Sequence, residues 1–357
     1  MLRATSLALL TASVLAAALL AGCGSDDDGD TAAPGTTSAA TTAAEAPEET
    51  LRVGLITDLG QLDDDGFNEL AFRGLTRAEE ELGVEGRVVE SASAADYIPN
   101  MSSLARQGYD LIIGVGFAQG DAIGQVAQRF PDTRFAIIDV DHEFVPGKPE
   151  NVQGLLFREE EVGYLVGYLA ALQEQRREGP DVISAVGGFK EPPVDRFIAG
   201  YRAGAQKAAP DVQVFWSYSQ DWDDQAKCKE LALDQIQRGS GVVFQVAGGC
   251  GLGALNAAGE RDRWGIGVDA DQSHLGDHIL TSAQKGVDAA VLLTIKSVLE
   301  GAWEGGGNAT FGLAEEGVGL GTVSAEVPDE DVEAVEAIER QIADGEISDI
   351  PTTVGRT

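Results

Sequence analysis

The chain has 357 residues, with 59 acidic side chains against 25 basic ones and a formal net charge of -34. Its length suits two modest domains, and a hydrophobic content of 43% predicts a packed globular body. The acid excess argues against nucleic acid as a partner, because binding phosphates needs a surface rich in Lys and Arg.

The N-terminus has the pattern of a secretory signal. Residues 1–22 contain one positive charge at Arg3, then an apolar stretch, and they end in small residues before Cys23. The apolar stretch is too short for a membrane-spanning helix. The position of Cys23 favours cleavage before it and lipidation of its thiol, over an ordinary signal with an incidental cysteine. We expect a lipid-anchored protein on the extracytoplasmic face of the cell membrane.

An acidic tether follows, and then the folded body. Residues 23–50 are rich in Thr, Ala, Pro and acid and show no apolar periodicity, which is typical of a flexible linker. From residue 51, β-branched runs alternate with helical patterns, as in parallel βαβ units. The expected strands are 52–57, 87–90, 111–115 and 135–139, and the expected helices are 67–82, one ending at 106 and one before 135.

The same order returns about 130 residues later. The expected strands are 182–186, 212–217, 241–248 and 264–269, with a helix at 197–207. Asp139 and Asp269 end the fourth strand of each series. This duplication predicts an α/β fold of two doubly wound parallel-sheet lobes with a ligand cleft at the carboxyl ends of the strands.

The remaining segment is expected to complete the sheets and to form the hinge. It contains a helix at 287–299 and a short strand near 318–323. We expect the bilobed domain to occupy residues 51–357. Lobe 1 would comprise about 51–158 plus 272–305, and lobe 2 about 159–271 plus 306–357.

An enzymatic interpretation rests on one turn. Residues 249–254 are glycine-rich and follow a strand, and Asp269 stands about 20 residues on, as in a dinucleotide-binding fingerprint. The turn follows a third strand, whereas the fingerprint usually follows a first, so the duplication is the simpler explanation. An NAD-dependent enzyme remains an alternative.

Metal chemistry has little support in the sequence. His274 and His278 could share a helix face, but no third ligand is indicated. The run Asp63–Asp65 lacks the downstream Glu of a calcium loop, and an acid at 64 or 65 that caps the following helix is the plainer interpretation. We expect no metal and no cofactor.

Several motifs resemble the basic membrane protein (BMP) family. They are residues 55–58, 64–68, 114–117, 223–232, 247–249 and 267–272. The family comprises substrate-binding lipoproteins of ABC transporters, typified by purine nucleoside receptors, with a type I periplasmic-binding-protein fold. The resemblance covers nearly all of residues 51–302. It implies a monomeric receptor without enzymatic activity, with a nucleoside as ligand and a membrane permease as partner. The alternative is a receptor for a sugar or another small molecule on the same fold.

The resemblance also implies a binding site between the lobes. The base would stack between two aromatic rings, its edge would bond to polar groups at a helix start, and the ribose hydroxyls would meet acids, backbone and a lysine. In that order the implied residues are Phe67 and Trp222; Asp64 and Asn68; and Asp269, Gly248 and Lys285, with Asp139 and Phe117 lining the first lobe. Each has a structural alternative: a core position for Phe67, an exposed helix cap for Trp222 and a surface charge for Lys285.

The sequence departs from the family pattern at two places. Asp65 stands where the family commonly has Lys, which leaves the preferred base open. Cys228 and Cys250 stand where the family more often has small residues, and we expect them in adjacent loops at the carboxyl ends of second-lobe strands. In an oxidising compartment they would form a disulfide; two buried free thiols are the alternative.

Overall fold

The computed structural model describes residues 50–59 and 62–355. The expected signal peptide at residues 1–22, Cys23 and the tether up to residue 49 lie outside the described residues. Within the described part of the chain, no helix is long and apolar enough to cross a membrane.

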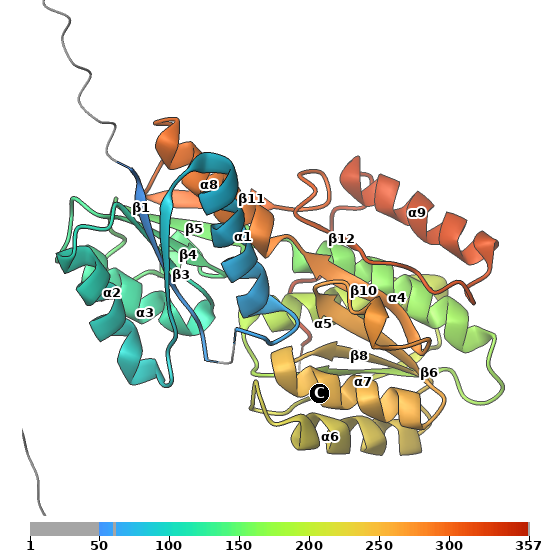
Figure 1. The fold of residues 1–357 in the computed structure, drawn as a ribbon. Coiled ribbons are helices and arrows are strands. Elements are labelled where there is room, and N and C mark those ends of the chain that lie inside the picture. The colour runs from blue at the N-terminus through green and yellow to red at the C-terminus, as the bar shows by residue number, and fades with distance from the viewer. Residues whose placement is uncertain (1–49, 60–61, 356–357) are drawn as a thin grey trace, which may run out of the picture. The chain divides into compact units, whose positions relative to one another are not determined.

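The first lobe is built on a six-stranded sheet whose strands all run parallel (Figure 1). Helices α1 and α8 pack against each other, and α2 and α3 form a second pair. In sheet order the strands are β11 (Gly307–Phe311), β5 (Val152–Phe157), β4 (Arg134–Ile138), β3 (Leu111–Gly114), β1 (Arg52–Ile56) and β2 (Glu85–Val89). The helices are α1 (Phe67–Leu82), α2 (Tyr97–Arg106), α3 (Gly120–Ala127) and α8 (Val287–Leu299).

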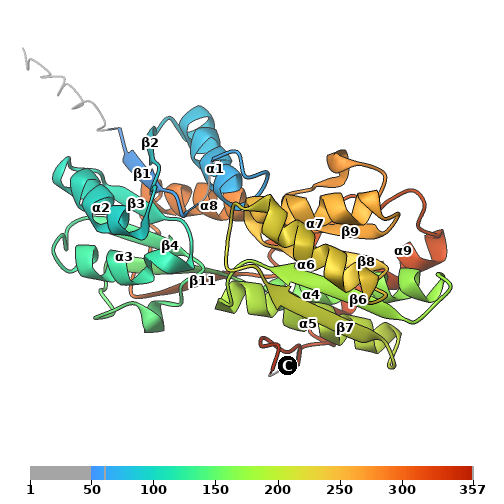
Figure 2. The same cartoon turned by 90° about the horizontal axis from the view of Figure 1, so that it is seen from below.

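The second lobe repeats this plan, except that one edge strand is antiparallel. Figure 2 shows α6 and α7 on one side of its sheet and α4 and α5 on the other. In sheet order the strands are β12 (Val318–Leu320), β10 (Ile279–Lys285), β9 (Trp264–Asp269), β8 (Val242–Val246), β6 (Val182–Gly187) and β7 (Gln213–Tyr218). The helices are α4 (Glu159–Gln175), α5 (Pro192–Ala208), α6 (Gln225–Gln237), α7 (Gly248–Glu260) and α9 (Asp329–Ala343).

The apolar strand runs explain why these sheets are covered on both faces. Every residue of β3, β6 and β8 is buried, whereas β2 and β7 at the sheet edges are partly exposed. Continuous burial is typical of a parallel strand with helices on both sides. The expected α/β fold with two doubly wound lobes is confirmed.

The expected lobe boundaries are wrong for two strands. Residues 279–285, assigned to the first lobe, form β10 beside β9 in the second sheet. Residues 307–311, assigned to the second lobe, form β11 beside β5 in the first sheet. The chain crosses to the other lobe after each of these strands. A division into long contiguous segments therefore assigns β10 and β11 to the wrong lobes.

The chain therefore passes between the lobes after β5, after β10 and between β11 and β12. These crossings are bonded to one another: Arg158 N–H donates to the carbonyl of Phe311 at 3.0 Å, and Gly286 N–H donates to that of Gly317 at 2.8 Å. The hinge is thus a set of neighbouring segments joined by backbone hydrogen bonds.

Glycines bring α4 and α5 into backbone contact. A Cβ at any of four positions would collide with a carbonyl oxygen of the partner helix, so these glycines permit the close approach. The positions are Gly163 and Gly167 on α4, and Gly200 and Gly204 on α5. We call this set the glycine contact.

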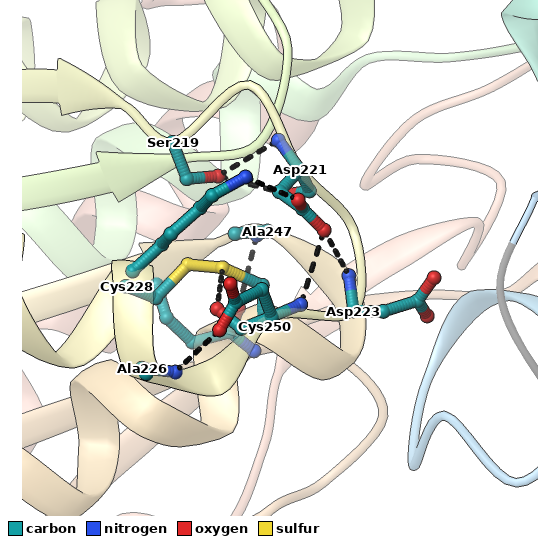
Figure 3. The surroundings of a disulfide bond; sticks show 10 residues. Ser219, Asp221, Asp223, Ala226, Cys228, Ala247 and Cys250 are labelled. Carbon is teal, nitrogen blue, oxygen red and sulfur yellow. Dashed lines mark hydrogen bonds and ion pairs between the residues drawn. A yellow bond between two sulfur atoms is a disulfide. The ribbon is translucent and has the colours of Figure 1, made fainter.

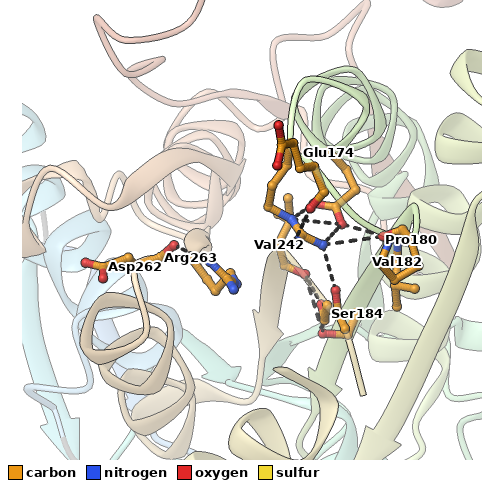
Figure 4. Close-up of polar contacts among 11 residues, drawn as sticks. Glu174, Pro180, Val182, Ser184, Val242, Asp262 and Arg263 are labelled. Atoms are coloured by element: carbon orange, nitrogen blue, oxygen red, sulfur yellow. Dashed lines mark hydrogen bonds and ion pairs between the residues drawn. The ribbon is translucent and has the colours of Figure 1, made fainter. Parts of the chain in front are cut away.

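Polar contacts tie α4 to the amino end of the second sheet (Figure 4). Val182 N–H donates to Glu174 Oε1 at 3.3 Å, and Arg177 joins the same carboxylate and the carbonyl of Gly239. The hydroxyl groups of Ser184 and Ser240 lie 2.8 Å apart nearby.

Candidate ligand-binding cleft

The two strand-end acids have the same unusual backbone conformation. Asp139 follows β4 with φ of 69°, and Asp269 ends β9 with φ of 62°. Side chains other than glycine seldom adopt this left-handed region, although Asp tolerates it better than most. The duplication inferred from the sequence therefore extends to the backbone at the strand ends.

All nine residues that the resemblance implied as ligand contacts line one cavity. Its empty space is about 670 Å³, part of which is open solvent. They are Asp64, Phe67, Asn68, Phe117, Asp139, Trp222, Gly248, Asp269 and Lys285. Lining residues that the sequence analysis missed include Asp58, Glu191, Pro193, Phe197, Asp223 and Gly249.

The aromatic walls of the cavity come from different lobes. Phe67 is the first residue of α1, and Trp222 lies in the loop between β7 and α6. Trp222 is half-buried and packs on Gly188, where a Cβ would collide with its ring, and its ring centroid lies 5.4 Å from that of Phe189. The alternative of an exposed cap at Trp222 is wrong, since the ring forms part of the cavity wall.

The Asp64 side chain mainly accepts hydrogen bonds from the backbone at the start of α1. Its oxygens accept hydrogen bonds from the backbone N–H groups of Gly66, Asn68 and Glu69 at 2.9–3.2 Å. The predicted helix cap is present, therefore, and Asp64 rather than Asp65 provides it. Asn68 is held too, because its Oδ1 accepts from the N–H of Asp58 at 3.0 Å.

Lys285 is the centre of a buried charge cluster. Its Nζ lies 2.7 Å from both carboxylate oxygens of Asp139 and 2.9 Å from Glu159 Oε1, and only 2% of its side chain is exposed. The surface-charge alternative is wrong. Burial opposes the charged ammonium, but attraction by Asp139, Glu159 and Asp269 outweighs it and raises the pKa of Lys285.

Glu159 was not predicted from the sequence. It opens α4 directly after the first crossing, and Lys285 ends β10 directly before the second. Asp139 belongs to the first lobe, so the cluster joins both lobes beside the hinge. Burial raises the pKa of Glu159, and Lys285 counteracts that effect.

Several carboxyl groups in the cavity wall have raised pKa values, and the largest shifts are those of Asp58, Asp269 and Glu191. Burial raises the pKa of Asp58 to about 6, although the hydroxyl of Tyr97 donates to it at 2.6 Å. Burial also raises the pKa of Asp269 and of Glu191 to about 7 each. Within the described residues, no hydrogen bond reaches the side chain of either Asp269 or Glu191. These two carboxyls are available to accept from a ligand.

The glycine-rich residues on which the enzymatic interpretation rests belong to helix α7, where they pack closely against neighbouring segments. Residues 249–254 lie inside α7, where a Cβ on Gly251 would collide with the side chain of Gln245 and one on Gly253 with the carbonyl of Gln225. These glycines allow close packing within the lobe.

The two histidines do not share a helix face. A short 3-10 turn ends at Leu275 after His274, whose Nε2 lies 3.2 Å from Asp65. His278 stands beyond that turn, with its ring against Gly259. Among the described residues, no group of three or more His, Cys, Asp or Glu is arranged to hold a metal ion.

Cys228 and Cys250 form a disulfide in the structure (Figure 3). Both are fully buried, in the first turns of α6 and α7. The expected position in strand-end loops is wrong by a few residues, because both helices begin immediately after those loops.

Known proteins share this architecture and sequence. The profile of the family described as "ABC transporter substrate-binding protein PnrA-like" matches residues 51–352. An ABC transporter nucleoside-binding protein of Lactococcus lactis is 32% identical, over 96% of this chain and 97% of its own. A Pyrococcus horikoshii protein named as a lipoprotein is 34% identical, over 76% of this chain and 69% of its own.

Solved structures agree with these sequence matches. The ABC transporter solute-binding protein from Aeropyrum pernix superimposes with a TM-score of 0.76 at 31% identity, covering 84% of this chain and 94% of the other. The fold and the cleft thus define a solute-binding protein of an ABC transporter, with a bilobed, type I periplasmic-binding-protein-like architecture. The chain belongs to the basic membrane protein family of such proteins, as the resemblance indicated.

Proposed function

We propose that the protein binds a nucleoside, with a purine as the expected base, and delivers it to a membrane permease. The observation that carries this proposal is the pairing of Phe67 and Trp222 from opposite lobes on one cavity. A nucleobase presents two flat faces, and stacking on an aromatic side chain contributes roughly 1–3 kcal/mol per base. No chemical change of the ligand is part of this proposal.

The polar wall supports a ribose beside the stacked base. Asp269 has a carboxylate without a hydrogen-bond partner among the described side chains, and Gly248 and Lys285 line the same cavity. A carboxylate can accept from two neighbouring hydroxyl groups, which free bases lack. A nucleoside would therefore use both walls, whereas a free base or a pentose would use one.

Ligand closure follows from the origin of these walls. A ligand that touches both lobes favours the state in which they are close, and that state would be the one presented to the permease. The name of the Lactococcus lactis relative, a nucleoside-binding protein, agrees with this ligand class.

We also propose attachment to the membrane through a lipid on Cys23. The support is the sequence before Cys23 together with relatives named as lipoproteins. Expression of Cys23→Ser should move the protein from the membrane fraction to the soluble fraction. Retention of this variant on the membrane would contradict lipid anchoring.

A sugar receptor is the second candidate. It is favoured by the partnerless carboxyls of Asp269 and Glu191, which suit a ligand with many hydroxyl groups. On this alternative, Trp222 alone would stack on the ring, and Phe67 would contribute little.

A thermal-shift panel separates the candidates. We expect nucleosides to raise the melting temperature and free bases, pentoses and NAD to have little effect. Trp222→Ala and Phe67→Ala should each remove the nucleoside shift, whereas Phe72→Ala, an exposed aromatic on the same helix as Phe67, should keep it. A shift with pentoses alone, unaffected by Phe67→Ala, would replace the nucleoside proposal with the sugar alternative.

A further inference from the structure

The disulfide lies directly behind one aromatic wall of the cleft. Cys250 is the third residue of α7, and the two residues before it, Gly248 and Gly249, line the cavity. Cys228 lies near the start of α6, six residues after Trp222. Figure 3 shows the two helix starts joined beneath the loop at Ser219–Asp223.

The backbone of Cys250 also holds the centre of that loop. Its N–H donates to the carbonyl of Trp222 at 2.7 Å. The same residue thus fixes Trp222 through its backbone and α6 through its side chain. A displacement of α7 relative to α6 would move the carbonyl of Trp222 with it.

The other bonds of the loop are mostly internal. Asp221 Oδ1 accepts from the N–H groups of Asp223 and Asp224 at 3.0 Å each, and Ser219 Oγ donates to the carbonyl of Asp221 at 2.8 Å. Lys227 pairs with Asp221 from the exposed side. These contacts give the loop its shape, but they do not fix its distance from α7.

The loop is tied to β6 on one side only. Ser219 and Gln220 donate their N–H groups to the carbonyls of Gly187 and Gly188 at 2.8 and 3.0 Å. Beyond Gln220, the backbone hydrogen bond to Cys250 is the next attachment to a neighbouring element. The Trp222 ring packs on Gly188 and lies beside Phe189, and the hydrogen bond from Cys250 holds the main chain that carries the ring.

We propose that the Cys228–Cys250 disulfide is a positioning element for the ligand, which holds the Trp222 wall and the Gly248 backbone in binding geometry. The two cysteines are positioning residues, since neither lines the cavity. The inference rests on the proposed function, because it assigns the disulfide to the site that would take a nucleoside.

The physical basis is preorganisation. With the disulfide intact, the loop is already in the conformation that stacks on a flat ring, so binding does not have to order it. Without it, only part of the population would present Trp222 correctly. If that fraction falls to about a tenth, the apparent Kd rises about tenfold.

The test compares the wild-type chain with Cys228→Ala/Cys250→Ala, both labelled with 5-fluorotryptophan. The ¹⁹F resonance of Trp222, assigned by its absence from Trp222→Phe, reports on the loop without any ligand. Guanosine and adenosine affinities are measured by calorimetry at a temperature where circular dichroism shows every variant folded. We expect the Trp222 resonance to broaden or shift in the double variant and Kd for the bound nucleoside to rise about tenfold.

Val335→Ala is the matched control for stability. Val335 is fully buried on α9, away from the cleft, and its truncation should lower the melting temperature while leaving the Trp222 resonance and Kd unchanged. The proposal is overturned if the double variant behaves like this control. If the double variant does not fold, the wild-type chain is treated with a phosphine until a thiol assay shows that both buried cysteines are reduced. An unchanged Trp222 resonance in the reduced, folded chain overturns the proposal there.

The two proposals fail in different ways. A wild-type protein that binds no nucleoside contradicts the proposed function, whatever the Trp222 resonance does. A wild-type protein that binds nucleosides with an affinity independent of the disulfide contradicts only the positioning role.

Discussion

The strand-end acids of the two lobes, Asp139 and Asp269, have the same backbone conformation but differ in the hydrogen bonds that their side chains make. Asp139 in the first lobe receives the Lys285 ammonium on both oxygens at 2.7 Å. Asp269 occupies the equivalent place in the second lobe, with φ of 62° against 69°, and its side chain has no hydrogen bond within the described residues. The Asp139 carboxylate is therefore paired within the protein, whereas the Asp269 carboxylate is available to accept hydrogen bonds from a ligand.

This difference gives the two halves of a repeated fold different chemistry at the cavity. Duplication reproduces the main chain, including the strained residue at the end of the strand. A single lysine at the end of β10 then breaks the symmetry, because it can pair with only one of the two acids at close range. A partly buried carboxylate without a hydrogen-bond partner costs stability and gains affinity for a donor, which is the condition expected of a binding group.

Removal of the lysine should have the largest effect. Lys285→Met leaves Asp139 buried without its counter-charge and leaves Glu159 only an ion pair with Arg196 at 3.6 Å, so we expect the free energy of unfolding to fall by about 3–5 kcal/mol. Urea denaturation followed by circular dichroism measures this. Lys296→Met removes an exposed lysine on α8 and should change the value by less than about 0.5 kcal/mol. Equal effects of the two substitutions would show that the buried cluster is not a stabilising unit.

Neutralising each strand-end acid should change stability in opposite directions. Asp139→Asn loses an ion pair with a buried lysine, and we expect a loss of about 2–3 kcal/mol. Asp269→Asn removes an unpaired carboxylate, and we expect a gain of roughly 1 kcal/mol at pH 8 together with weaker ligand binding. The same urea titrations, run without ligand, measure both. A loss of stability in both variants would show that the Asp269 carboxylate is stabilised by a partner in the folded protein.

The acids with raised pKa values should also make stability depend on pH. The pKa values of Asp269 and Glu191 are raised to about 7, and that of Asp58 to about 6, so the folded state binds more protons than the unfolded state between about pH 4 and 7. Their contribution is fully present below the unfolded pKa values and is lost as the pH rises through 7. We expect the free energy of unfolding to fall by about 1 kcal/mol from pH 5.5 to pH 8, given screening by water in the cleft.

Asp269→Asn provides the control for this pH dependence. The variant lacks one of the titrating groups, so its loss of stability between pH 5.5 and pH 8 should be smaller than that of the wild type. An unchanged slope would assign the effect to other groups.

The smallest effect is expected at a contact between the lobes. Asp65 lies 3.2 Å from His274, and its carbonyl accepts from Gln272 at 3.0 Å. His274 is largely exposed, so His274→Gln should change stability by less than about 0.5 kcal/mol. Any effect should appear as faster ligand dissociation, measured by stopped flow, because the contact joins the lobes. Slower dissociation would contradict this role.

Much of the fold could be predicted because most elements keep a clear hydrophobic period. The helices at 67–82 and 287–299 and the strand at 264–269 have the bounds expected from the sequence. Helix α4 was missed because it is buried nearly all round, so it lacks an amphipathic period. Strand β10 was missed because its buried residues include Thr281, Ser282 and Lys285.

The binding cleft was predictable only where a motif marks it. Every residue carried over from the family resemblance lines the cavity, whereas Glu159 and Glu191 were overlooked. Glu159 begins an acidic run at a helix N-terminus, which is where solvated acids are common. Only the long-range approach of β10 shows that this particular acid is buried beside a lysine.

The glycine contact between α4 and α5 influences the shape of the cleft from a distance. Helix α4 begins with Glu159, and α5 carries Pro193 and Phe197 into the cavity wall. A side chain added at Gly163 or Gly200 would push the helices apart and thereby change the width between these groups. Variation at positions that never meet the ligand could therefore alter which ligands fit, and a comparison of cavity residues alone would not detect it.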